Sequence, residues 1–153
     1  MNPFDLKSAL LAKHAQHVVL VHFPIALTIT AILFDWLAAS RPGPRSSVLS
    51  AAAYWNLTVA AIASIATVAT GLLAWQWQLD GAPLKGTLLL HAVFGGASTG
   101  GILLLWWLRF RRRHESDRSL GPVYFALTVV VLLLVAATGH LGGFVSGVNS
   151  IGN

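Results

Sequence analysis

The sequence has no cysteine and few charged residues for its length. Without cysteine sulfur the chain has no disulfides, thiolate metal sites, iron–sulfur clusters or covalently attached c-type haem. Charged residues make up 10% of the 153 residues, whereas an ordinary soluble domain has about a quarter. Hydrophobic residues make up 56%. This composition predicts an integral membrane protein without a soluble domain.

Four apolar segments are each long enough to cross a bilayer as a helix, which takes ~20 residues. Helices are required, because open backbone cannot face lipid and four strands cannot close a barrel. The segments are separated by connectors with the proline and glycine content of turns. We therefore expect one all-α domain over residues 1–153, an up-and-down four-helix membrane bundle. Its helices are predicted at about 17–39, 51–78, 87–110 and 121–145.

The distribution of basic residues predicts the orientation of the bundle. Seven arginines lie in or beside the first and third connectors, and three lysines lie on the other side. Cytoplasmic loops carry the excess of Lys and Arg, so both termini are expected on the periplasmic side of a bacterial inner membrane. The pI near 10.5 then reflects topology, and no nucleic-acid partner is expected. The basic residues are Arg41, Arg45, Arg109, Arg111, Arg112, Arg113 and Arg118 against Lys7, Lys13 and Lys85.

Three histidines share one depth in the predicted bundle. His22 lies about five residues inside the first helix, and His91 and His140 lie similarly far from the outer ends of theirs. At 1.5 Å per residue, this depth is ~6 to 9 Å below the outer end. An ionisable residue within the membrane is a functional-site hypothesis by default. His14 and His17 come a turn or more above this layer and are expected to line its mouth.

Two cofactors suit such a layer. A b-type haem needs two axial imidazoles from facing helices and small residues beside the porphyrin. His91, with Gly95 one turn later, supplies a ligand and clearance, and His22 or His140 supplies the second ligand. A copper or zinc ion instead needs three or four ligands. The ligands available for that ion are His17, His22, His91 and His140, with Asp80 in the outer connector.

Other features have structural interpretations. Asp35, near the inner end of the first helix, is predicted to pair with Arg109 at similar depth. Pro24 lacks an N–H and is expected to free a carbonyl near the histidines. The small residues of the second and third helices favour close packing, within a larger membrane complex or a homo-oligomer, without requiring either. The third helix contributes Gly95, Gly96, Gly100 and Gly101.

Several motifs together support a family resemblance. They are "VVLVHFPIAL" followed by Asp35, His91 at the start of the third helix, and "GHLGG" near the C-terminus. With these motifs the chain resembles, over nearly its whole length, the bacterial four-helix membrane proteins catalogued as domain of unknown function 2231. Related segments are joined to c-type cytochrome domains, so the resemblance implies an electron-transfer setting. Family members often have His-Pro where this chain has His17 and Val18, and a tail with Tyr and His where it has "FVSGVNSIGN".

Haem binding is the leading functional hypothesis. We expect a b-type cytochrome-like protein that binds haem b near the periplasmic side. It would exchange electrons with a periplasmic c-type cytochrome or a larger membrane complex. The sequence has no nucleophile–base arrangement, phosphate loop or carboxylate pair, so a non-catalytic electron-transfer or structural role is favoured. Histidine-based metal binding and a purely structural subunit are the alternatives.

Overall fold

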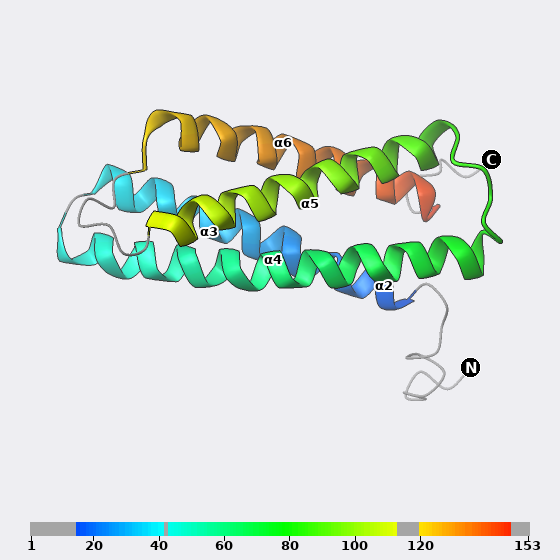
Figure 1. Cartoon of the computed structure of the whole chain (residues 1–153), viewed down its shortest axis with the longest axis horizontal. Helices are drawn as coiled ribbons and strands as arrows, with labels where there is room; N and C mark the ends of the chain where they lie inside the picture. The colour runs from blue at the N-terminus through cyan, green and yellow to red at the C-terminus, as the bar shows by residue number, and fades with distance from the viewer. Residues whose placement is uncertain (1–14, 42, 113–119, 148–153) are drawn as a thin grey trace.

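The computed structural model describes residues 15–41, 43–112 and 120–147. Within these ranges all regular structure is helical, with one short helix followed by four long ones (Figure 1). The predicted all-α, four-helix architecture is therefore confirmed. The helices are α2 (Ala15–Leu20), α3 (His22–Ser40), α4 (Pro44–Gln78), α5 (Gly86–Arg112) and α6 (Pro122–Val145).

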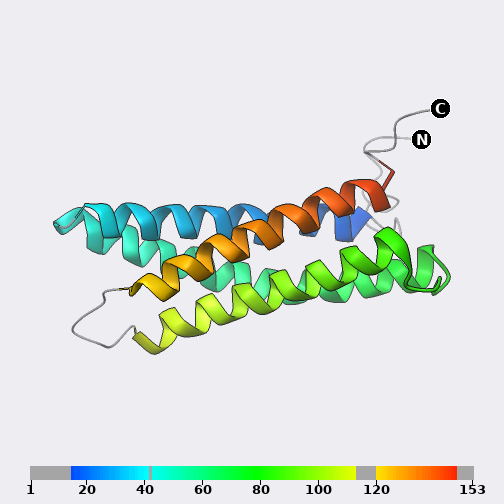
Figure 2. The ribbon, with the colours of Figure 1, turned by 90° about the horizontal axis from the view of Figure 1, so that it is seen from above.

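Consecutive long helices run antiparallel and form a bundle (Figures 1 and 2). α3 packs along α4 and α5 along α6, and α4 also contacts α5, whereas α3 touches α6 more sparsely. The start of α2 and the end of α6 lie at one end of the bundle, which we call the histidine end. The opposite end we call the arginine end, because the described arginines lie there. They are Arg41, Arg45, Arg109, Arg111 and Arg112.

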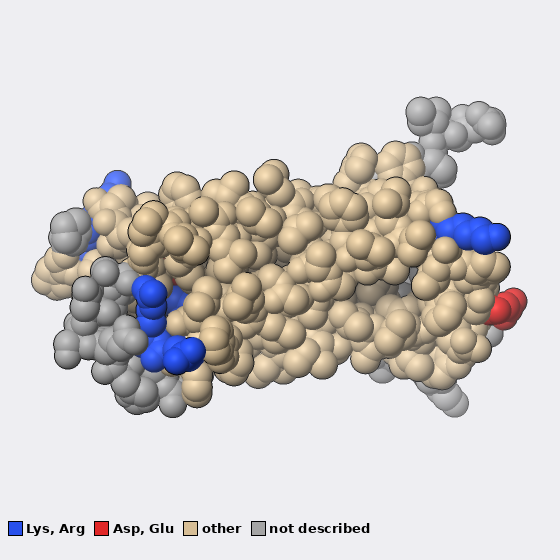
Figure 3. Space-filling model, turned by 45° about the horizontal axis from the view of Figure 1, so that its top comes forward, with Lys and Arg blue, Asp and Glu red and all other residues tan. Residues whose placement is uncertain are grey.

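The long helices have the length and composition of membrane spans. Four candidate spans have mean hydropathies between 1.8 and 2.2, and α2 and α3 together form the first, Gln16–Ser40. Charged side chains gather at the two ends of the bundle and leave an uncharged belt between them (Figure 3). The belt exposes large apolar side chains such as Ile62 and Leu133, each 66% exposed, which lipid solvates well. The protein is thus a multi-pass membrane protein.

α4 is longer than predicted. It begins at Pro44, whereas the predicted helix begins at residue 51. Gly43 has a φ of 141°, a conformation that favours glycine, and proline is well suited to the first helical position that follows. The next residues are polar, so hydropathy assigned them to the connector. Ser47 is nevertheless helical, and its hydroxyl donates to Pro44 O at 2.8 Å. The other helix ends differ from the predicted ones by two residues or fewer.

The first span is interrupted at Val21, between α2 and α3. Pro24 has no N–H, so the carbonyl of Leu20, one turn earlier, loses its usual helical donor. The hydroxyl of Thr67 on α4 donates to Leu20 O instead, at 3.4 Å. The prediction that Pro24 frees a carbonyl near the histidines is confirmed, and the freed carbonyl links the first span to α4.

One buried ionic cluster joins all four long helices at the arginine end. Arg109 Nη1 on α5 lies 3.2 Å from Asp35 Oδ1 on α3, with the two side chains 7% and 1% exposed. The Tyr124 hydroxyl on α6 donates to Asp35 Oδ2 at 2.6 Å. Arg109 also donates to the carbonyl and hydroxyl oxygens of Ser50 on α4. The predicted pair of Asp35 and Arg109 is therefore confirmed.

The middle of the bundle is an apolar core in which α5 and α6 approach closely. Leu105 and Val131 are completely buried. A Cβ added at Gly101 would lie 2.7 Å from Val131 Cγ2, whereas Cβ atoms at Gly96 and Gly100 would have no described neighbour within 4 Å. Close packing therefore explains Gly101, while Gly96 and Gly100 face outward from the bundle.

Candidate functional site

His17 of α2 is held against α4 through one ring nitrogen. Its Nδ1 lies 3.1 Å from Thr67 O and 3.4 Å from Thr70 Oγ1. A carbonyl oxygen only accepts, so Nδ1 carries the proton and the lone pair of the neutral ring is on Nε2. Gly71 lies against the ring, because a Cβ there would be 2.9 Å from His17 Cε1. We call Thr67 and Gly71 the first histidine seat.

His91 of α5 is held against α6 in the same manner. Its Nδ1 lies 3.2 Å from Thr138 O, which again assigns the lone pair to Nε2. A Cβ at Gly142 would be 3.1 Å from His91 Cε1. The Thr138 hydroxyl is 2.9 Å from the hydroxyl of Ser98, which is buried on α5. Thr138 and Gly142 form the second histidine seat.

The two seats repeat one arrangement in the two halves of the bundle. Each has a threonine carbonyl and, four residues later, a glycine, in "TVATG" at 67–71 and "TGHLG" at 138–142. Each holds a histidine from the start of the preceding span, 50 and 47 residues before the threonine. Neither seat was predicted from the sequence, although the repeated Thr-x-x-x-Gly pattern could have revealed them.

The two seated imidazoles are close neighbours. Their ring centroids are 6.5 Å apart and their planes are inclined by 82°. Two imidazoles bound on opposite sides of one metal ion, with metal–nitrogen bonds of about 2.0 Å, have centroids roughly 6 to 6.5 Å apart. In each ring the hydrogen bond at Nδ1 leaves Nε2 as the nitrogen whose lone pair is available to a ligand-binding metal. The separation of the two rings is therefore compatible with one metal ion bound between them.

The structure brings together His17 and His91, which were both in the predicted metal-ligand set but were not one of the predicted haem pairs. His22 is exposed, and its Nδ1 lies 2.8 Å from Val18 O of the same span. His140 is also exposed; it stacks edge-to-face on Phe144, with centroids 5.0 Å apart, and borders an apolar groove between α3 and α6. His17, expected at the mouth and as a candidate metal ligand, is the neighbour of His91. His14 lies outside the described residues.

Gly95 packs beside the second seat and not beside an imidazole. A Cβ there would be 3.7 Å from Thr138 Cγ2, which is an ordinary packing distance between α5 and α6. The clearance for the imidazole rings comes from Gly71 and Gly142. The clearance that the sequence predicts at Gly95 is for a porphyrin, and it stays a prediction.

Because this site offers only two imidazoles, the number of protein ligands limits which cofactors it could hold. Among the described residues, no group of three or more His, Cys, Asp or Glu side chains is arranged to hold a metal ion. Zinc sites take at least three protein ligands. A b-type haem takes two axial imidazoles, because the porphyrin nitrogens supply the other four ligands. The donor set of His17 and His91 therefore fits haem b better than it fits zinc.

The comparisons with known proteins agree with this architecture. A family model described as "Predicted membrane protein (DUF2231)" matches residues 13–153, a range that includes all four spans and both histidine seats. No curated protein and no solved structure matches the chain. The chain belongs to the DUF2231 family of predicted membrane proteins.

Proposed function

We propose that this protein is a membrane-embedded b-type cytochrome that holds one haem b between His17 and His91. One observation carries the proposal. Two imidazoles from different halves of the bundle lie 6.5 Å apart, each with Nδ1 on a backbone carbonyl. In the proposed role, the protein passes electrons between the membrane and a redox partner outside it.

The seats prepare both histidines for metal ligation. A hydrogen bond from Nδ1–H to a carbonyl fixes the tautomer and the ring orientation, and it makes Nε2 a stronger ligand. Gly71 and Gly142 allow each ring to lie directly against a helix backbone. When bound, haem b would supply one-electron redox chemistry at a potential set by its axial ligands and their hydrogen bonds.

The distribution of charge supports a site near the periplasmic side. The described arginines lie at one end of the bundle and both seated histidines at the other. By the positive-inside rule the arginine end faces the cytoplasm of a bacterial inner membrane. The surface in Figure 3 is hollowed toward the histidine end. A periplasmic c-type cytochrome, or a larger membrane complex, is the proposed partner.

The test is an absorption spectrum of the detergent-purified protein, expressed with ample haem, before and after reduction with dithionite. We expect a sharp Soret band, resolved α and β bands on reduction, and one haem per chain. His17→Ala and His91→Ala should each abolish the low-spin spectrum, because each removes an axial ligand. His22→Ala and His140→Ala are matched controls, and both should keep the wild-type spectrum.

Two results would contradict this assignment. Loss of the spectrum in His22→Ala or His140→Ala, with His17→Ala unaffected, would return the ligands to the layer predicted from depth alone. A flat visible spectrum after haem-replete expression would exclude the cytochrome altogether.

A single copper ion is the second candidate, since the same separation of 6.5 Å also suits two imidazoles on one ion, and imidazole is a good copper ligand. Metal analysis distinguishes the candidates. A copper protein would contain one copper per chain without a Soret band and would lose the metal to a chelator. A haem protein would keep its spectrum in the chelator.

A further inference from the structure

An apolar groove runs between α3 and α6 toward the histidine end, where these two helices touch only sparsely. Its volume of about 480 Å³ falls within the range of ligand pockets, roughly 300–1,000 Å³. Ile29 and Leu133, one on each wall, are 47% and 66% exposed, so the groove opens sideways into lipid. The residues that line it include Ile25 and Ile29 of α3 and Leu133, Ala136, Gly139 and His140 of α6.

His140 gives the groove one polar end. It lies about five residues before the end of the fourth span at Val145, which is ~8 Å below that end at 1.5 Å per residue. The other described lining residues are aliphatic or glycine. An imidazole has two ring nitrogens, so His140 can hydrogen-bond to a ligand while it keeps a second contact within the protein. The groove therefore has the polarity of a molecule with a small polar head and an apolar tail.

His22 stands on the other wall of the groove at a similar level. Spacings of three and seven residues place it on the same face of α3 as Ile25 and Ile29. Its Nδ1 donates to Val18 O at 2.8 Å, because a carbonyl oxygen only accepts, and this leaves the lone pair on Nε2. Two imidazoles, one from each wall, therefore stand at the polar end of the groove.

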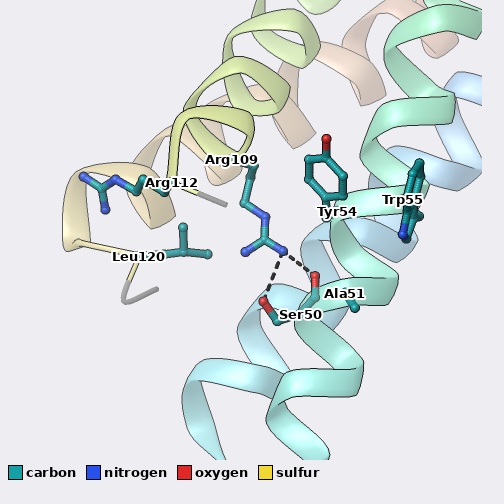
Figure 4. A pocket seen from close by; sticks show the side chains of 7 residues that line it. All are labelled: Ser50, Ala51, Tyr54, Trp55, Arg109, Arg112 and Leu120. Atoms are coloured by element: carbon teal, nitrogen blue, oxygen red, sulfur yellow. Dashed lines mark hydrogen bonds between the residues drawn. The ribbon is translucent and has the colours of Figure 1, made fainter. Parts of the chain in front are cut away.

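The absence of charge in the groove argues against a phospholipid headgroup as its polar occupant. Among the described residues, those that line the groove include no Lys, Arg, Asp or Glu. The described arginines lie at the opposite end of the bundle, where Arg109 donates to Ser50 (Figure 4). A phosphate at the depth of His140 would be buried below the end of the span without a cationic partner, which is costly. The polar head of the occupant must therefore be uncharged.

The polar end of the groove lies beside the second histidine seat. Gly142, which packs against the ring of His91, follows His140 by two residues on α6. Residues two apart point to nearly opposite faces of a helix, so the groove and the His91 ring are separated by about one helix diameter, ~10 Å. A redox-active molecule in the groove would therefore be a close neighbour of the proposed haem.

We propose that this groove binds an isoprenoid quinone, with its ring between His140 and His22 and its tail along Ile29 and Leu133. Such a molecule is uncharged, and its ring oxygens accept hydrogen bonds as the quinone and donate them as the quinol, which suits neutral imidazoles. Its role as electron carrier rests on the proposed function. Oxidation of the quinol to the quinone releases two electrons, which the ferric haem accepts one at a time in two turnovers, and two protons, which pass to water at the histidine end.

The test is photolabelling of the full-length protein in lipid nanodiscs with an azido derivative of ubiquinone-2, followed by mass spectrometry of its peptides. We expect label on the groove residues of α3 and α6, and unlabelled ubiquinone-2 should suppress it. Geraniol has the same two-isoprene tail without the quinone ring and should compete far more weakly. His140→Phe keeps an aromatic ring without its nitrogens and should weaken competition by ubiquinone-2 about fivefold, the effect of one hydrogen bond.

Two leucine substitutions form a matched pair. A Cβ at Gly139 or at Gly96 has no described neighbour within 4 Å, so neither substitution meets the protein's own packing there. Gly139 lines the groove, and Gly139→Leu should reduce labelling at least about fivefold by filling it. Gly96 lies on the lipid-facing side of α5, and Gly96→Leu should label like the wild type.

The outcomes distinguish a quinone site from a groove that accepts any apolar chain. Equal competition by geraniol and ubiquinone-2 would overturn the quinone. Label spread evenly over the lipid-facing helices, or lost equally in the two leucine variants, would overturn the site. The haem spectrum separates this inference from the proposed function. A wild-type haem spectrum without label in the groove refutes the quinone alone, whereas label in the groove with a flat visible spectrum refutes the haem and leaves the quinone site standing.

Discussion

Adding one methyl group beneath His17 should disrupt the proposed ligation without unfolding the protein. In Gly71→Ala the new Cβ would lie 2.9 Å from His17 Cε1, whereas ordinary contact begins at 3.4 Å. The imidazole must therefore move by at least 3.4 − 2.9 = 0.5 Å. Metal–ligand distances are held to about 0.2 Å, so this displacement is too large for His17 to remain an axial ligand.

Three glycines form a graded series for this prediction. At Gly142 the shortest distance is 3.1 Å, to His91 Cε1, which requires a smaller movement of 0.3 Å, and at Gly96 there is no described neighbour within 4 Å. We expect the low-spin fraction of the haem spectrum to fall most in Gly71→Ala, less in Gly142→Ala, and not at all in Gly96→Ala. Alanine is the better helix former by about 1 kcal/mol, so stability should be retained in the Gly96 control.

The assay is the reduced absorption spectrum together with the unfolding midpoint of each variant in the same detergent. Gly71→Ala should keep a midpoint close to wild type, because the ring can swing away at the end of a flexible side chain. If Gly71→Ala has the same low-spin spectrum as Gly96→Ala, His17 is not a haem ligand in this geometry.

The remaining predictions concern stability, measured as the free energy of unfolding in mild detergent. Asp35→Ala leaves Arg109 buried and without its partner and should cost about 3–5 kcal/mol; a cost below that of Tyr124→Phe would contradict the central place of this carboxylate. Tyr124→Phe removes one hydrogen bond to a charged group and should cost about 1.5–3 kcal/mol; an unchanged free energy would mean that the bond contributes nothing. Gly101→Ala forces a Cβ against the buried Val131 and should cost about 1–3 kcal/mol; a stabilised variant would refute the close approach of α5 and α6.

The sequence by itself determined the spans and the depth of their polar residues. Hydropathy locates the helices because the bilayer requires long apolar segments, and the constant rise per residue places Asp35 and Arg109 at one level. Because lipid does not solvate a charge, each of these two side chains is expected to pair with the other. The freed carbonyl near Pro24 was predictable too, because it follows from the missing N–H alone.

Only the tertiary structure decided which histidines meet. Depth along a helix is set by residue count, but the direction in which a side chain points depends on helix rotation and on interruptions such as the one at Val21. His22 and His140 lie near the predicted depth and remain exposed, while His17 turns toward His91. The repeated Thr-x-x-x-Gly pattern marks both seats in the sequence, but the groups that hold the rings are backbone carbonyls, which every residue has. Which histidine each seat holds is therefore decided only when the helices pack.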